Sequence, residues 1–242
     1  MNESEMRAAA FLAHEGHKDI VHHPDGQHLP PDFLVDQRIA VEVRRLNQNY
    51  VGKRRIEGLE EEAIRLRDRI RKLALSFGPP TQGASWFLTL DFRRPVARWK
   101  TLEPKLHQVL QGFMDGIHSE TRVWLGDGFA LELFRANRAH QTFYVPGPPD
   151  DDDAGGWLIP EMQRNLQICI CEKTRKISQY KSKYPEWWLV FDDRIGYGLD
   201  DSDREQFREI VTLPAHDFDR IVLVNPLDYR HAFQIAPDFR DI

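Results

Sequence analysis

Two carboxylates, Asp32 and Glu42, flank a stretch of nine residues, 33–41, whose pattern is typical of a hairpin. Apolar residues alternate along two short segments joined by Asp36-Gln37-Arg38, which predicts two paired strands. Such a hairpin would bring the carboxylates together, and carboxylate oxygens suit a hard divalent cation such as Mg²⁺ or Mn²⁺. With the basic Arg44 beside them, this arrangement is what a metal-dependent phosphodiesterase needs.

The second segment, 39–45, is predicted to be a strand whose side chains point alternately to two faces. Three apolar residues share one face: Ile39, Val41 and Val43. Glu42 and Arg44 lie on the other face, in the middle of the strand. Folding alone does not favour charged residues at such a position, so the sequence indicates a functional role for them.

Pro31-Asp32, followed on the next strand by Glu42-Val43-Arg44, resembles the motif of the PD-(D/E)XK nuclease superfamily, which has the restriction-endonuclease-like fold. Arg44 stands where that family usually has lysine. The motif covers roughly the first fifth of the chain. The resemblance implies Mg²⁺-dependent hydrolysis of phosphodiester bonds in nucleic acid, with Asp32 and Glu42 as metal ligands and the Val43 carbonyl completing the shell. DNA is the expected partner.

The family often adds an acid from its first helix to the metal site. A helix is predicted from about Ser4 to Glu15, ended by Gly16, and Glu15 is the residue that fits this role by resemblance. The alternative is that Glu15 is a boundary residue near solvent.

In the same superfamily, a lysine from a neighbouring helix can replace the motif lysine. A helix predicted from Pro160 to about Lys183 carries Lys173 in the middle of its apolar stripe, with Lys176 at the flank as a reserve. The resemblance therefore assigns Lys173 to the site. The alternative is that its stem packs and its amine reaches water. Arg44 stays charged and can only neutralise phosphate, so Arg44, Arg45 and Lys176 are the predicted nucleic-acid contacts.

The whole chain of 242 residues is predicted to be a single α/β domain with a restriction-endonuclease-like core, a mixed central sheet flanked by helices. A largely helical insertion is expected over about 50–120, and the composition of 146–156 predicts a flexible loop. No apolar run approaches the ~20 residues that cross a bilayer, and no secretory signal is visible, so we expect a cytoplasmic protein without membrane contact.

One long helix is predicted over 56–77, where apolar residues recur at alternating spacings of three and four. They form three heptads of a seam: Ile56, Leu59, Ala63, Leu66, Ile70, Leu73 and Phe77. Another helix of the same chain is the expected partner, and a homodimer is the alternative.

Histidines 14, 17, 22, 23 and 28 crowd the end of the first helix and the following loop, but their spacing fits no familiar zinc pattern. They are predicted to be surface residues. Cys169 and Cys171 are too few for a structural zinc site and are predicted to be reduced.

Two other functions remain compatible with the sequence. The arginine at position 44 would also suit a catalytically degenerate nuclease fold that binds nucleic acid or serves in assembly. Alternatively, Asp32 and Glu42 are ordinary salt-bridge partners of Arg38, Arg44 or Arg45 in an interaction protein that dimerises through the 56–77 helix. The net charge of −5 argues against general coating of nucleic acid, although basic residues cluster at 44–55, 93–100 and 173–183.

Overall fold

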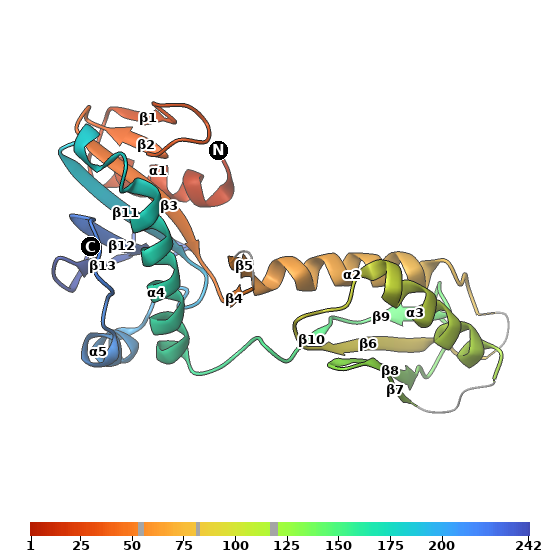
Figure 1. Cartoon of the computed structure of the whole chain (residues 1–242). Coiled ribbons are helices and arrows are strands. Elements are labelled where there is room, and N and C mark those ends of the chain that lie inside the picture. The colour runs from red at the N-terminus through yellow and green to blue at the C-terminus, as the bar shows by residue number, and fades with distance from the viewer. Residues whose placement is uncertain (53–55, 81–82, 117–120) are drawn as a thin grey trace. The chain divides into compact units, whose positions relative to one another are not determined.

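The computed structural model describes residues 1–52, 56–80, 83–116 and 121–242. The chain divides into two compact units (Figure 1). Unit 1 comprises Met1–Asn49 and Gly156–Ile242, and unit 2 is Tyr50–Gly155. Unit 2 is thus inserted into the sequence of unit 1, between the predicted hairpin and the helix that carries Lys173.

Unit 1 is built around a mixed sheet of seven strands. Their order in the sheet is β1 (Ile20–His22), β2 (Phe33–Val35), β3 (Ile39–Leu46), β11 (Glu186–Asp193), β12 (Arg220–Val224), β13 (Ala232–Ala236) and β14 (Arg240–Asp241). The three central strands, β3, β11 and β12, are parallel, and the flanking pairs are antiparallel. The predicted α/β class with a mixed central sheet is confirmed.

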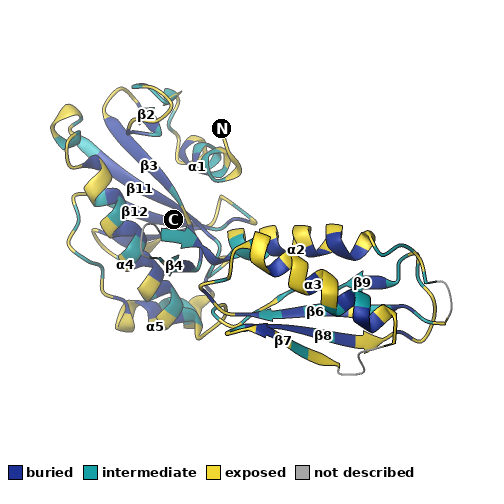
Figure 2. Ribbon diagram, turned by 45° about the vertical axis from the view of Figure 1, so that its right-hand side comes forward, coloured by how far each residue is buried: buried dark blue, intermediate teal, exposed yellow. Residues whose placement is uncertain are grey.

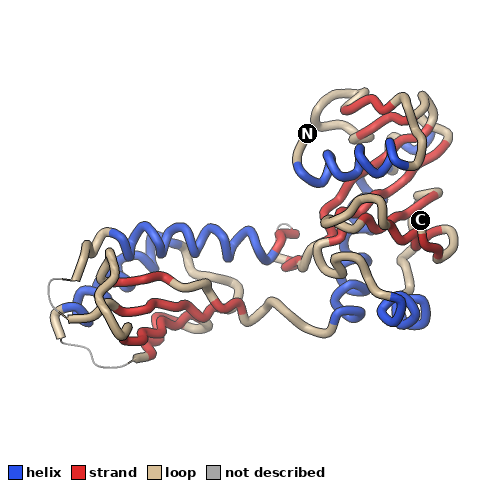
Figure 3. The backbone as a smooth tube through the Cα atoms, turned by 180° about the vertical axis from the view of Figure 1, so that it is seen from behind, coloured by secondary structure: helices blue, strands red, loops and turns tan. Residues whose placement is uncertain are grey.

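Helices cover both faces of this sheet, as Figure 3 shows. Helix α1 (Glu3–His14) packs on one face, and α4 (Leu158–Ile177) and α5 (Asp201–Ile210) pack on the other. A short 3₁₀ turn, η1 (Lys181–Lys183), follows α4. The side chains of β3 alternate as predicted: Val41 and Val43 share the core of α1, whereas Ala40 and Leu46 share the core of α4. The face that carries Glu42 and Arg44 is therefore the α4 face.

The β2–β3 hairpin is closed by Asp36 and Gln37, whose φ angles of 48° and 58° lie in the left-handed region used by tight hairpin turns. Pairing runs from Val35 opposite Ile39 to Phe33 opposite Val41. One further step in this register places Asp32 opposite Glu42. The turn therefore fixes the spacing that brings the two carboxylates together.

Unit 2 contains a five-stranded sheet and two helices. Its elements are β5 (Ile56–Gly58), α2 (Leu59–Leu75), β6 (Trp86–Phe92), α3 (Trp99–Met114), β7 (Arg122–Gly126), β8 (Phe129–Arg135), β9 (Tyr144–Pro146) and β10 (Asp150–Asp151). The short strand β4 (Asn49–Val51) pairs with β5 where the chain passes from unit 1 to unit 2. The expected largely helical insertion over about 50–120 instead contains a sheet and extends to Gly155, because β8, β9 and β10 pair with β6 and β7 pairs with β8.

The long helix of unit 2 begins at Leu59 rather than at Ile56, because 56–58 form β5. Its apolar residues Leu66, Ile70 and Leu73 are buried in one core with residues of α3 and the five-stranded sheet. Figure 2 shows this division, with buried positions toward the sheet and exposed positions outside. These three seam residues are thus packed within the chain, where their partner is expected from the sequence.

The segment 146–156, predicted to be a flexible loop, is held against unit 2 by contacts of its acidic residues. Asp150 and Asp151 form β10, which runs parallel to β6. The guanidinium of Arg94, only 2% exposed, donates to Asp151 at 2.6 and 2.8 Å and to Asp153 at 3.2 Å. These contacts replace the hydration that a buried guanidinium loses.

None of the described helices combines the length and the apolar character that crossing a bilayer requires.

Buried Asp193, at the end of β11, predicts a pH dependence of the stability of unit 1. Burial raises the pKa of Asp193 to about 6, although its carboxylate accepts N–H bonds from Ile195 at 3.1 Å and Gly196 at 2.8 Å. Since this folded-state pKa exceeds the ordinary value of about 3.9, the folded chain holds an extra proton between about pH 4 and pH 6. The free energy of unfolding should therefore fall as the pH rises through this window, by at most about 3 kcal/mol from this group.

Asp193→Asn keeps an oxygen for the two N–H groups but does not titrate. Chemical denaturation should show the variant gaining stability relative to the wild type between pH 4 and pH 7. Glu209→Gln, on exposed α5, is the control for loss of a surface carboxylate. A difference between Asp193→Asn and the wild type that does not change with pH would contradict the prediction.

Candidate functional site

The carboxylates of the hairpin lie side by side at the start of β2 and the middle of β3. Asp32 Oδ2 accepts the Val43 N–H at 2.7 Å, a bond that holds the Asp32 side chain against β3. Glu42 has no exposed surface. A carboxylate removed so completely from water requires compensating charge or hydrogen bonds.

That compensation comes from α4. Lys173 Nζ donates to Glu42 Oε2 at 2.6 Å and lies 3.6 Å from Asp32 Oδ2. Lys176 Nζ donates to Glu42 Oε2 at 2.9 Å and to Oε1 at 3.2 Å. The Lys173 side chain is 8% exposed, so its amine points at the hairpin and does not reach out to water. The structure therefore brings together Asp32, Glu42, Lys173 and Lys176.

Lys173 is directed inward by the period of α4. It lies on the buried stripe of that helix with Leu166, Ile170 and Ile177, three apolar residues packed against the sheet. Lys176 lies at the edge of the stripe, and its side chain is 37% exposed. Burial by itself would lower the pKa of Lys176, but attraction and hydrogen bonding to Glu42 outweigh it, and the pKa is raised. Lys176 is therefore charged at neutral pH.

A cleft of about 610 Å³ opens beside these residues, entirely within unit 1. It is lined by the N-terminal end of α1 (2–5), by the hairpin residues Asp32, Val43, Arg44 and Arg45, and by Glu172, Lys173, Lys176 and Arg194. Glu42 is absent from this lining, since the lysine amines cover its oxygens. The cleft is of mixed charge, because its five basic side chains are accompanied by four carboxylates, which come from α1, the hairpin and α4.

Arg44 lies in the cleft but turns toward α4. Its guanidinium is 3.5 Å from a Glu172 oxygen and donates to Asn49 Oδ1 at 3.4 Å. Arg38 pairs instead with Glu186 at 3.0 Å. Within the described chain neither of these arginines is paired with Asp32 or Glu42, so lysines of α4, which the salt-bridge hypothesis did not name, neutralise the hairpin.

Glu15 does not join the cleft, and this prediction is corrected. It caps the far end of α1, where its carboxylate accepts from Arg220 at 3.0 Å, and Arg220 in turn lies over the Trp188 ring. The cleft receives the other end of the helix, including Glu3 and Glu5. Twelve residues of helix span about 18 Å, so the two ends cannot serve one site.

A sequence pattern places Glu5, the acid nearer the cleft, at the start of α1, although it does not show which end of α1 faces the hairpin. Asn2 and Glu5 form a capping box, in which each side chain accepts the other residue's backbone N–H. Glu5 is thereby fixed at the helix start, next to the cleft.

The donor set fits a hard divalent cation. Asp32, Glu42 and the Val43 carbonyl offer only oxygen, which Mg²⁺ and Mn²⁺ prefer. The two lysine amines that donate to Glu42 lie where a divalent cation would neutralise it. Lys176, the more exposed of the two, is the one able to leave without exposing the apolar stripe.

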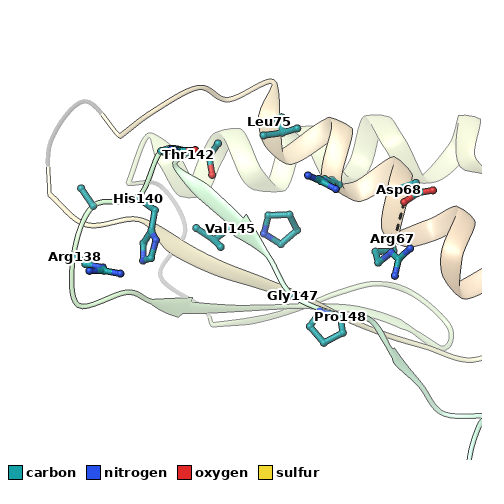
Figure 4. A pocket seen from close by; sticks show the side chains of 13 residues that line it. Arg67, Asp68, Leu75, Arg138, His140, Thr142, Val145, Gly147 and Pro148 are labelled. Atoms are coloured by element: carbon teal, nitrogen blue, oxygen red, sulfur yellow. Dashed lines mark ion pairs between the residues drawn. The ribbon is translucent and has the colours of Figure 1, made fainter.

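Unit 2 has a separate concavity of about 1130 Å³ (Figure 4). Its lining includes three arginines and a histidine: Arg67, Arg71, Arg138 and His140. Asp68 is the acid in this lining, and it lies 3.7 Å from Arg67. We call this concavity the basic pocket. It lacks the paired carboxylates of the cleft in unit 1 and is suited to binding an anion rather than to hydrolysis.

Comparisons with protein-family models, with curated proteins and with solved structures give no match for this chain.

Proposed function

We propose that unit 1 is a metal-dependent nuclease domain of the PD-(D/E)XK type that hydrolyses phosphodiester bonds of nucleic acid, with DNA as the expected substrate. The observation that carries this proposal is the convergence of Asp32, Glu42 and Lys173. Lys173 Nζ lies 2.6 Å from one carboxylate and 3.6 Å from the other, although more than a hundred residues separate it from the hairpin.

In this proposal Asp32, Glu42 and the Val43 carbonyl hold Mg²⁺ or Mn²⁺. The ion supplies a bound water of lowered pKa and neutralises phosphate charge. Lys173 keeps its ammonium beside the carboxylates, where it can neutralise negative charge that develops on the attacked phosphate. Arg44, Arg45 and Lys176 line the cleft and contact phosphates of the bound strand.

A second function is favoured by one specific observation. Both Glu42 oxygens accept from lysines, and Arg44 is directed to Glu172, so the site is electrostatically satisfied without an ion. A catalytically degenerate nuclease fold that binds nucleic acid or serves in assembly would look like this. Metal affinity and cleavage, measured together, separate the two functions.

Manganese binding should depend on the hairpin carboxylates. Calorimetry should show Mn²⁺ binding by the wild type, and an affinity at least about tenfold weaker, or about 1.4 kcal/mol, in Asp32→Asn and in Glu42→Gln. Both substitutions preserve shape and remove one negative charge. Glu209→Gln, on exposed α5, should bind as the wild type does. Equal affinities across all four proteins would favour the degenerate fold.

DNA cleavage should depend on Lys173 more strongly than Mn²⁺ binding does. Lys173→Met keeps the packed stem and removes the ammonium, and should lower the rate of Mg²⁺- or Mn²⁺-dependent DNA cleavage by about 100-fold or more. Mn²⁺ affinity should change by less than about threefold, because an ammonium is no metal ligand. Lys176→Met should have the smaller effect.

Lys181→Met, in the 3₁₀ turn after α4 and outside the cleft, is the control for loss of a lysine. Thermal denaturation of each variant establishes that unit 1 is folded. Undiminished cleavage by Lys173→Met would remove this residue from the mechanism. Metal binding without cleavage of single- or double-stranded DNA or RNA would support the degenerate fold.

The basic pocket of unit 2 should add affinity for nucleic acid without affecting metal binding. Arg71→Ala combined with Arg138→Ala should reduce the slope of log affinity against log salt by about one for each phosphate that the variant no longer binds. Fluorescence anisotropy with labelled DNA at several salt concentrations measures this slope. Arg230→Ala, whose guanidinium is already paired with Asp228 at 2.8 Å, is the control. An unchanged slope in the double variant would exclude the pocket from binding.

A further inference from the structure

Three potential metal ligands of a different kind meet at the N-terminal end of α1. Glu5 lies in the first turn of the helix, His22 is the last residue of β1, and His23 follows it. One ligand atom from each lies within 4.8 Å of the other two. His22 Nε2 is 3.2 Å from Glu5 Oε2. We call these residues the Glu5–His22–His23 cluster.

The backbone is shaped to put both imidazoles on one side. Adjacent residues of an extended strand point in opposite directions, which would separate His22 from His23. His23 instead has φ of 49°, in the left-handed region that side chains other than glycine rarely adopt, and the ring centroids lie 3.7 Å apart. Its N–H donates to the Asp32 carbonyl at 2.9 Å, which anchors this conformation.

One atom of the cluster is unexplained by the protein alone. His23 Nδ1 is buried and has no hydrogen-bond partner among the described residues. A simple ion pair between His22 and Glu5 would leave this nitrogen unsatisfied, and an orphaned buried polar atom requires a partner. A metal ion bound through this nitrogen would satisfy it and would join all three side chains in one site.

We propose that the Glu5–His22–His23 cluster binds a borderline divalent metal ion of the Zn²⁺ class. Two imidazoles and one carboxylate are a donor set for such ions, whereas Mg²⁺ prefers oxygen alone. Bonds of 2.0–2.1 Å in a tetrahedron place neighbouring ligand atoms about 3.4 Å apart, close to the 3.2 Å between His22 and Glu5. The Asn2 N–H, which donates to Glu5 Oε2 at 2.8 Å, orients the carboxylate as outer-shell donors do.

The cluster opens on a cavity of about 660 Å³ that is also lined by His28 and Asp32. Asp32 and Glu5 line both this cavity and the cleft beside the hairpin, whereas the two histidines line only this one. The zinc-class site is thus a neighbour of the hairpin carboxylates with different donors. It does not depend on the proposed nuclease function.

Zinc affinity tests the site directly. Full-length protein without a polyhistidine tag, stripped with chelator, is titrated with Zn²⁺ in a calorimeter. We expect one ion per chain with a dissociation constant of about 1 µM or lower. His22→Ala and His23→Ala should each weaken binding by about 100-fold or more, since each removes a direct ligand. Co²⁺ substituted for Zn²⁺ should give a visible absorption band that these variants lose.

Two control variants distinguish zinc binding at this cluster from zinc binding elsewhere on the chain. His14→Ala removes an exposed histidine at the other end of α1 and should leave Zn²⁺ affinity within about threefold of the wild type. Glu209→Gln, on exposed α5, should do the same, because Glu209 lines neither this cavity nor the cleft. Dissociation constants above about 100 µM, unchanged binding by the histidine variants, or equal loss in His14→Ala would each overturn the proposal. Loss of Mn²⁺ binding by Glu42→Gln bears only on the nuclease proposal.

Discussion

The contact of Glu42 with Lys173 and Lys176 constrains the rest of unit 1. A carboxylate with no exposed surface is costly unless its charge is matched, and the match here comes from a helix far away in the sequence. The ion pairs of Glu42 with the two lysines therefore join β3 to α4 in one specific register. Apolar packing alone would tolerate small shifts of α4 along the sheet, but a lysine moved by one turn would leave Glu42 unpaired. These ion pairs thus have a structural role, whether or not the site catalyses a reaction.

The structural role of these ion pairs is compatible with the proposed catalytic role, because either a divalent cation or a lysine amine neutralises Glu42. Lys173, held in the apolar stripe, stays beside the carboxylates, while the half-exposed Lys176 can exchange with an ion at small packing cost. Arg44 cannot exchange in this way, since it is already engaged with Glu172 and Asn49. Arginine at position 44, where the PD-(D/E)XK superfamily usually has lysine, is thus compatible with the proposal that α4 supplies the lysine.

The parts of this site that follow from the sequence are those set by local periodicity. The period of two along 39–45 puts Glu42 on the α4 face, and the helical period of 160–177 puts Lys173 at the centre of a buried stripe. The failures come from long-range geometry. The resemblance suggests Glu15 for the site, and no local pattern shows which end of α1 meets the hairpin. The proximity of the His22 and His23 rings depends on the left-handed conformation of His23, which no glycine or asparagine in the sequence indicates. The extent of unit 2 is underestimated for a related reason, since β7 to β10 are defined by their pairing within the sheet of β6 and not by their own short patterns.

Although unit 2 is inserted between the two halves of the site, a second polar anchor holds those halves in register. This anchor is Asn49, the last residue of unit 1 before the insertion. Its N–H donates to Asn165 Oδ1 at 2.7 Å and its side-chain amide donates to the same oxygen at 3.1 Å, with both residues buried. Asn165 lies on α4 about two turns before Lys173. The chain is therefore fastened to α4 at Asn49 and again at Glu42, and two polar anchors on one rigid helix determine both its position and its rotation against β3. Among the described residues, these carboxylate–lysine and asparagine contacts all lie within unit 1, so an insertion of this size is compatible with a site assembled from both sides of it.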